Sequence, residues 1–306
     1  MKILESEKIV GINAFYSDFE GIGGKLKSNP YDFIVREISN YPPEDKKGKF
    51  TIAEVKSVNW ENNILIRELS KSLHISRNRI NFAGTKDKRA KTTQLLSFYK
   101  VPIENINKID LKDIEIKNIY KSNKPVKIGN LIGNSFEITI RDIKRNIKKR
   151  DLSRIKDFFD IKKGFPNYFG IQRFGVIRPN SHIIGKYLVK GDIKSAVLSY
   201  LGSPTKFEDE KTYSLRKKFD ETHDFRSALQ NFTKKLNYEL SILNKLAVDP
   251  DDYVSALKEL PKNLLTLFIY AYQSYLFNKI ISKRIQDNIP INNAIIGDII
   301  LPVRNN

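Results

Sequence analysis

The sequence of 306 residues contains no cysteine and only three histidines, and these scarcities exclude several kinds of chemistry. Without cysteine there is no disulfide, no thiolate zinc site and no cysteine nucleophile, and the composition suits a reducing compartment. His74, His182 and His223 lie far apart in the sequence. A zinc site or a Ser-His-Asp hydrolase is therefore a poor interpretation of this chain.

The chain also lacks a long apolar run. Its first residues, MKILESEKIV, include acids and no apolar core of a signal peptide. The most apolar stretch, residues 264–277, is interrupted by Thr266, Gln273 and Ser274 and is shorter than the ~20 residues that span a bilayer. We expect a cytoplasmic protein without a membrane partner, of about two domains by its length.

Acidic residues are scarce relative to basic ones: 54 Lys and Arg face 35 Asp and Glu, a net charge of 54 − 35 = +19. The excess is +6 in residues 1–100, +11 in 101–200 and +2 in 201–306. Residues 69–103 hold eight basic side chains and a single acid, Asp87, and residues 161–191 hold six basic side chains and no acid.

Both basic stretches contain aromatic residues, among them Phe82, Phe98, Phe165 and Phe169, so they should be folded. Cations that bind phosphates and rings that stack on unpaired bases are typical of an RNA surface. The competing interpretation is a solvated basic face over ordinary core aromatics. An anionic membrane is a weaker alternative, because no basic amphipathic helix carries the charge.

Hydrophobic periodicity predicts strands first and helices later. We expect strands at 33–38, 50–58, 94–99, 114–120 and 134–141, and helices at 63–74, 150–159, 183–189, 193–201, 224–246 and 264–285. In the strand at 134–141, Phe136, Ile138 and Ile140 alternate with polar residues, so we expect it to be half-buried on that face. This order favours an α+β core followed by a mostly helical region.

Asp87 is the most informative candidate for catalysis. It lies in the loop FAGTKDKRA between Lys86, Lys88 and Arg89, and nearby positive charge favours the ionised form of a carboxylate. An ionised carboxylate suits a nucleophile or a base. The alternative is that Asp87 only neutralises a crowded basic loop or caps a turn.

Two other motifs fail on spacing. The segment Gly21–Lys25 resembles a phosphate-binding loop, but the first glycine of that motif is Phe19 here and Leu26 follows the lysine. Asp249, Asp251 and Asp252 are better explained as a helix N-cap than as metal ligands.

Several motifs together resemble the TruD-type tRNA pseudouridine synthases, in the archaeal and eukaryotic branch of that family. They occur in the family's order along the whole chain: KSNPYDFIVRE at 27–37, FAGTKDKRAKTTQ at 82–94, GNSF at 133–136, PNYFGIQRFG at 166–175 and YQSYLFN at 272–278. One departure is Ile171, where the family often has an acidic residue.

The resemblance implies an α+β fold: a pseudouridine synthase core with a mixed, largely antiparallel sheet, and a mostly helical insertion domain. We expect the N-terminal part of the catalytic core in residues 1–190 and the insertion domain in residues 191–306. In this family the chain returns to the core through a C-terminal segment that carries a further aromatic residue. The sequence ends at Asn306, so we expect that segment to be missing and the insertion to be incomplete.

The resemblance also assigns roles to particular residues. Asp87 becomes the catalytic aspartate. The expected substrate-binding residues are Phe33, Asn167, Phe169, Lys27 and Lys86, with the two lysines suited to a backbone phosphate. Lys88, Arg89 and Arg173 are expected along the RNA backbone. Core packing is the alternative for Phe33 and Phe169.

The implied reaction detaches uracil from C1′ of its ribose, rotates it and rejoins it through C5, so it requires no cofactor and no metal. The implied partner is tRNA, with the uridine at position 13 of the D arm as substrate, flipped out of the RNA. The competing function is a catalytically incompetent RNA-binding protein or RNA chaperone. An enzyme acting on an anionic metabolite ranks below both.

Overall fold

The computed structural model describes residues 3–146, 148–162 and 164–300. Residues 301–306 and Lys163 of the second basic stretch lie outside the described residues. The chain divides into two compact units: a sheet unit, Gly21–Lys148, and a helical unit, Met1–Glu20 with Lys149–Asn306. The expected domain division between residues 190 and 191 stays a prediction.

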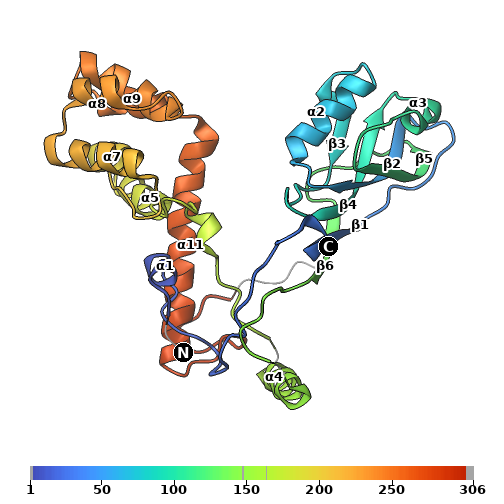
Figure 1. The fold of residues 1–306 in the computed structure, drawn as a ribbon, viewed down its shortest axis with the longest axis horizontal. Helices are drawn as coiled ribbons and strands as arrows, with labels where there is room; N and C mark the ends of the chain where they lie inside the picture. Colours follow the sequence, from blue (N-terminus) through green and yellow to red (C-terminus); the bar gives the residue numbers. More distant parts are fainter. Residues whose placement is uncertain (1–2, 147, 163, 301–306) are drawn as a thin grey trace. The chain divides into compact units, whose positions relative to one another are not determined.

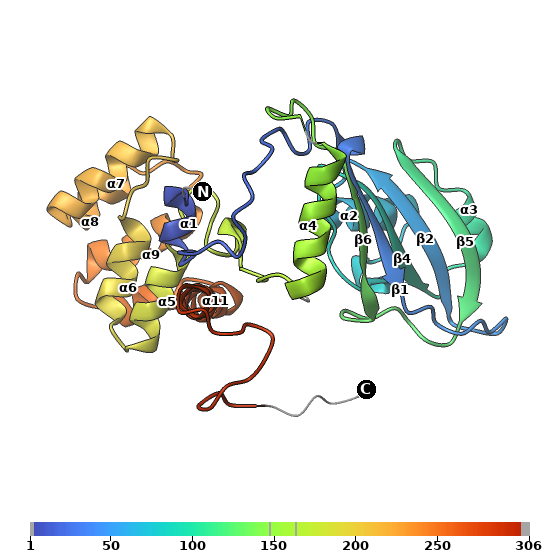
Figure 2. The ribbon, with the colours of Figure 1, turned by 90° about the horizontal axis from the view of Figure 1, so that it is seen from below.

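The sheet unit is built on a six-stranded sheet. Its strands are β1 (Phe33–Ser39), β2 (Phe50–Val58), β3 (Ile80–Phe82), β4 (Lys91–Tyr99), β5 (Ile114–Ser122) and β6 (Leu131–Ile138). The order is β5-β2-β4-β1-β6, and β3 also pairs with β4 (Figure 2). Only β1 and β4 are parallel among these pairs. The prediction of a mixed, largely antiparallel sheet is confirmed.

Two helices, α2 (Asn62–Ser72) and α3 (Ile103–Asn107), pack on the strands and contribute side chains to the core of this unit. The apolar face of α2 buries Leu65 and Leu69 against Val55 and Phe98 of the central strands. The Glu61 carboxylate caps the first turn of α2 by accepting from Asn63 N and Ile64 N. The short turn η1 (Pro30–Asp32) leads into β1, and η2 (Arg77–Arg79), which Ser76 caps by accepting from Asn78 N, connects α2 to β3.

The expected burial of β6 is wrong. Phe136 and Ile138 share a face as the alternation predicts, but they are 54% and 46% exposed. The reason is position, because β6 is the edge strand beyond β1, and the α2 core packs on other strands of the sheet. The strand also ends at Ile138, so Ile140 lies outside it.

The helical unit is built from helices and the loops that connect them. Its helices are α1 (Glu5–Ile9), α4 (Lys149–Lys162), η3 (Ile171–Arg173), α5 (Ser181–Val189), α6 (Ile193–Leu201), α7 (Glu210–Thr222), α8 (Phe225–Asn231), α9 (Asn237–Val248), α10 (Tyr253–Lys258) and α11 (Lys262–Gln286) (Figure 1). The α11 helix has 25 residues and packs along α5. Gly185 permits this approach, since a Cβ there would lie 2.0 Å from the carbonyl oxygen of Phe268.

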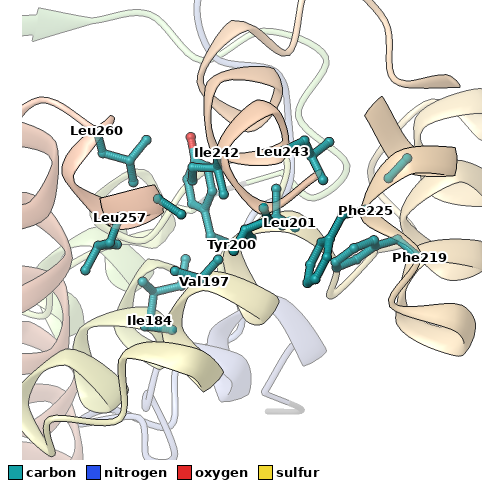
Figure 3. Close-up of a cluster of buried hydrophobic side chains, with 14 of the residues drawn as sticks. Ile184, Val197, Tyr200, Leu201, Phe219, Phe225, Ile242, Leu243, Leu257 and Leu260 are labelled. Atoms are coloured by element: carbon teal, nitrogen blue, oxygen red, sulfur yellow. The ribbon is translucent and has the colours of Figure 1, made fainter. Parts of the chain in front are cut away.

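The core of this unit is apolar and aromatic (Figure 3). Tyr200 and Leu201 of α6 belong to one cluster with side chains from α7, α8 and α9, and the rings of Phe219 and Phe225 lie 5.9 Å apart, tilted by 45°. One expectation is wrong here: the predicted helix at 224–246 is two helices. Phe232 has extended backbone angles and turns its ring into the core, which ends α8.

Other expectations for the helical unit are confirmed. The bounds of α6 are as predicted, and Asp252 caps α10 by accepting from Ser255 N. Within the described residues, no helix has the length and apolarity that a membrane span requires.

His182 joins the first turn of α5 to the aromatic residues of α11. Its ring stacks on that of Tyr275 with centroids 4.6 Å apart and meets Phe174 edge-on at 5.3 Å. Burial lowers the pKa of His182 to about 4, because the imidazolium would lose its hydration there. The native protein therefore holds His182 neutral at pH values where the unfolded chain binds a proton.

We predict that acid destabilises the chain through His182. The folded pKa is depressed, so the stabilising effect is present above the unfolded pKa of about 6.5 and decreases as the pH falls towards 4. The unfolding free energy should lose about 3 kcal/mol over that interval through this group. Urea denaturation followed by circular dichroism at several pH values should show this loss in the wild type.

The control is His182→Phe, which should flatten that part of the pH profile. His223→Gln, at the exposed C-terminal end of α7, reports the effect of losing a histidine as such. An acid limb that persists unchanged in His182→Phe would contradict the assignment.

Candidate active site

Asp87 lies in the loop that joins β3 to β4, with 43% of its side chain exposed. Its carboxylate accepts a hydrogen bond of 2.6 Å from Lys27 Nζ. The same ammonium group lies 4.0 Å from the centroid of the Phe33 ring. A partly exposed carboxylate, a cation and an aromatic face are thus brought together from three separate segments of the sheet unit.

The segment that carries Lys27 is fixed at both ends. Lys25 and Arg141 exchange backbone hydrogen bonds of 2.7 and 3.0 Å, which ties the segment to the residues after β6. The Asp32 carboxylate accepts hydrogen bonds of 2.7–3.0 Å from the Arg141 guanidinium. These bonds hold the pKa of Asp32 below its usual range. Arg89 donates to the carbonyl of Ser28 at 2.7 Å and links this segment to the Asp87 loop.

A buried ion pair fixes the Asp87 loop from the other side. Lys86 Nζ lies 2.6 Å from Glu37 Oε2, and their side chains are 5% and 1% exposed. The other carboxylate oxygen of Glu37 accepts from the backbone N–H of Leu95 and from Ser39 Oγ. Since Lys86 directly precedes Asp87, this pair sets the position of the carboxylate at the surface.

Apolar side chains lie beside the Lys27–Asp87 pair. Phe33 pairs with Ile138 and Val35 pairs with Phe136 across β1 and β6, so these side chains share one face of the sheet. The rings of Phe33 and Phe136 meet edge-to-face at 5.9 Å. The exposure of Phe136 and Ile138 leaves an open apolar surface beside Phe33, whose ring contacts the ammonium group that binds Asp87.

The structure brings together six of the residues expected at the site: Lys27, Phe33, Lys86, Asp87, Lys88 and Arg89. The resemblance implies that Lys86 binds a phosphate. In the structure its ammonium group is buried and paired with the Glu37 carboxylate. Lys88 is exposed on the same loop. Asn167, Phe169 and Arg173 belong to the helical unit, so their contact with the same nucleotide stays a prediction.

Sequence reasoning missed Glu37 and Phe136 as site residues. Glu37 closes the KSNPYDFIVRE motif and could have been noticed as an acid within a strand. The alternation of Asn134–Arg141 indicates the face of Phe136, but no sequence signal indicates that this face is open.

In the helical unit, the segment 167–174 lies along α11 and is held by polar side chains. Asn278 accepts from Phe169 N at 2.9 Å and donates to the carbonyl of Phe169 and to that of Val10. Tyr168 Oη lies 3.2 Å from Ser282 Oγ, and Arg173 Nε donates to Ser274 Oγ at 3.1 Å. Asn167 is exposed at the start of this segment.

No group of three or more His, Asp or Glu side chains in the described part of the chain is arranged to hold a metal ion. The chemistry that the sheet unit offers is that of one ionisable carboxylate beside a cation, an aromatic ring and an open apolar surface. Such a site suits a flat, neutral ring attached to an anionic backbone, as in a nucleotide of RNA.

Comparison with known proteins agrees with a site that binds a nucleotide of RNA. A family model described as "tRNA pseudouridine synthase D (TruD)" matches residues 9–306. A Methanosarcina mazei protein named "Probable tRNA pseudouridine synthase D" is 41% identical over 302 residues, which covers 98% of this chain and 69% of the relative. A Pyrococcus abyssi protein of the same name is 40% identical over 291 residues, covering 95% and 69% of the two chains.

A crystal structure of a Methanosarcina mazei protein described as a TruD superposes with a TM-score of 0.89 at 41% identity. The match covers 97% of this chain and 68% of that chain. The chain belongs to the tRNA pseudouridine synthase D (TruD) family.

We predict that Glu37→Gln destabilises the sheet unit by about 3–5 kcal/mol, because it leaves the Lys86 ammonium buried without a counter-charge. Trp60, the only tryptophan of the chain, lies in the sheet unit, so its fluorescence during urea denaturation reports on this unit.

Adding Lys86→Met to Glu37→Gln should recover much of the loss, since the glutamine oxygen can still accept from Leu95 N and no buried charge remains. Glu137→Gln, which breaks the exposed pair with Arg36 on the neighbouring strands, is the matched control and should change the midpoint little. Equal effects of Glu37→Gln and Glu137→Gln would refute the role of the buried pair.

Proposed function

We propose that this chain isomerises a uridine of tRNA to pseudouridine, at position 13 in the D arm, with Asp87 as the catalytic residue. The observation that carries the proposal is the pairing of the partly exposed Asp87 carboxylate with Lys27, whose ammonium group lies on the Phe33 ring. Membership of the TruD family supports the reaction and the tRNA substrate.

The reaction breaks the bond between C1′ of the ribose and N1 of uracil and forms a bond between C1′ and C5. C5 then loses its proton, and N1 ends with one, so no atom is gained or lost overall. Asp87 can serve by attack on the sugar, by attack on the base, or by removal of the C2′ proton. In each case the hydrogen bond from Lys27 Nζ holds the Asp87 carboxylate in place.

The target uridine must leave the RNA stack before the glycosidic bond becomes accessible. Phe33, Phe136 and Ile138 form the open apolar surface, and we assign to it the contact with the flipped base. Lys88 and Arg89 lie on the Asp87 loop and are suited to the flanking phosphates. In the helical unit, Asn167 and Phe169 would contact the target nucleotide, and Arg173 the backbone.

We predict that Asp87→Asn abolishes pseudouridine formation and leaves the Kd for tRNA within about threefold of wild type, because the fold and the cations are retained. A tRNA transcript incubated with each protein and analysed by a pseudouridine-specific chemical reaction gives the readout, and a transcript with cytidine at position 13 tests the site.

Asp142→Asn is the matched control, because Asp142 is an exposed aspartate of the same unit paired with Lys25. Product at the wild-type rate from Asp87→Asn would overturn the assignment. Tight tRNA binding by the wild type without any product would favour the RNA-binding protein.

We predict that tRNA binding weakens steeply with salt. If Lys88, Arg89 and Arg173 each neutralise one phosphate, the Kd should rise about 20- to 40-fold between 50 and 200 mM salt. Lys88→Ala should reduce the log-log slope by about one. Lys258→Ala, an exposed lysine on α10, is the control, and a flat salt dependence in the wild type would argue against tRNA as the ligand.

A further inference from the structure

Four flat groups follow one another along the surface of α11 in the helical unit. The rings of Phe277 and Phe169 lie 5.3 Å apart, the Arg173 guanidinium lies 5.6 Å from the Phe169 ring, and it lies 5.9 Å from the Tyr270 ring. We call this row, Phe277, Phe169, Arg173 and Tyr270, the aromatic ladder. Two of its members belong to α11 and two to the segment before α5.

Hydrogen bonds from buried residues of α11 hold the ladder in position. Asn278 binds both the N–H and the carbonyl of Phe169, which fixes that backbone on α11. Ser274 accepts from Arg173 Nε and donates to the carbonyl of Tyr270. Ser274 and Asn278 are 3% and 0% exposed, so the support is internal while the flat groups remain outside.

The three rings are exposed to an unusual degree for aromatic residues: Tyr270 by 50%, Phe277 by 41% and Phe169 by 38%. Among the described residues, no carboxylate lies within ion-pair distance of Arg173. The ladder is therefore a preformed row of rings that includes one cation without a protein counter-charge. Exposed aromatic rings next to such a cation are what an RNA strand requires, with bases on the rings and a phosphate on the guanidinium.

We propose that the aromatic ladder is a stacking site for an unpaired nucleotide of tRNA. The Arg173 guanidinium contacts the phosphate of that nucleotide, and its base stacks on Tyr270. All four residues of the ladder belong to the helical unit. Phe169 is the residue assigned above to the target nucleotide, so the nucleotide held by Arg173 and Tyr270 is a neighbour of the target in the RNA strand. The ligand class rests on the proposed function, in that tRNA is the substrate.

Elsewhere the exposed surface of α11 carries the apolar residues Ile269, Leu276 and Ile280, with the polar residues Gln273 and Lys279 among them. Exposed apolar residues of this kind can also bind a second protein chain. The ladder favours RNA, because Arg173 would bring an unpaired positive charge into a protein interface. Self-association through α11 is accordingly an outcome that the experiment must separate from RNA binding.

The test is Tyr270→Ala in the full chain, with an unmodified tRNA transcript as the probe. Loss of one stacked base should raise the Kd about 5- to 150-fold and leave the log-log salt slope unchanged. Arg173→Ala should raise the Kd and reduce the slope by about one, and Arg173→Lys should restore the slope but not the whole affinity.

Matched controls exist in the same unit. Tyr238 of α9 is 47% exposed, and Arg226 of α8 is exposed, so Tyr238→Ala and Arg226→Ala change the same residue types away from the ladder. Thermal unfolding of each variant checks that the helical unit is intact. Equal affinities of Tyr270→Ala and Tyr238→Ala would overturn the proposal, and so would a Tyr270→Ala variant whose only change is lower self-association.

The two proposals fail separately. If the wild type forms pseudouridine and the ladder variants bind like their controls, only the stacking site is refuted. If the wild type forms none and Tyr270→Ala still weakens tRNA binding, the stacking site stands and the proposed reaction fails.

Discussion

The sheet unit depends on the buried ion pair between Glu37 and Lys86. The parallel partner of β4 is β1 at residues 91–93, whereas β3 pairs with β4 at residues 96–98. Leu95 of β4 lies between these two pairings. Its backbone N–H donates to the Glu37 carboxylate instead of to a carbonyl of a neighbouring strand. A carboxylate enclosed to this extent requires a cation, and Lys86 supplies it. The contact that completes the sheet therefore also places the next residue, Asp87, at the surface.

In the helical unit, α11 has a polar seam where a buried helix face is usually apolar. Ser274, Asn278 and Ser282 of this seam bind backbone and side-chain groups of the segments at 10–14 and 168–174. The hydrogen bonds from α11 fix the position of the segment at 168–174 along the helix. An apolar helix face would instead favour burial of the aromatic rings of that segment. Polar support thus explains how Phe169 can be rigidly held and still face outward.

The sequence predicts the elements that depend on local pattern, such as β2 and α6, whose bounds are as expected. It cannot predict the break between α8 and α9, because the helical pattern continues through Phe232 and only tertiary packing turns that ring inward. For the site, the motif indicates Asp87, and the structure supplies its pairing with Lys27. The partner of Lys86 lies 49 residues away in the sequence, so no local rule finds it.

The net charge of +19 overstates the charge available to RNA. In the first basic stretch, Arg79 donates to the carbonyls of Tyr99 and Lys100, and Lys86 is neutralised by Glu37. In the second, Arg178 donates to the carbonyl of Gly202. These cations satisfy buried or backbone acceptors and cannot leave them without a cost in folding free energy. In the proposed function, the electrostatic attraction for a phosphate backbone would then come from fewer side chains than the composition suggests. Lys88 is exposed, whereas Arg89 and Arg173 would have to bind phosphates while they donate to the Ser28 carbonyl and to Ser274 Oγ. Aromatic stacking would accordingly supply a larger share of the affinity.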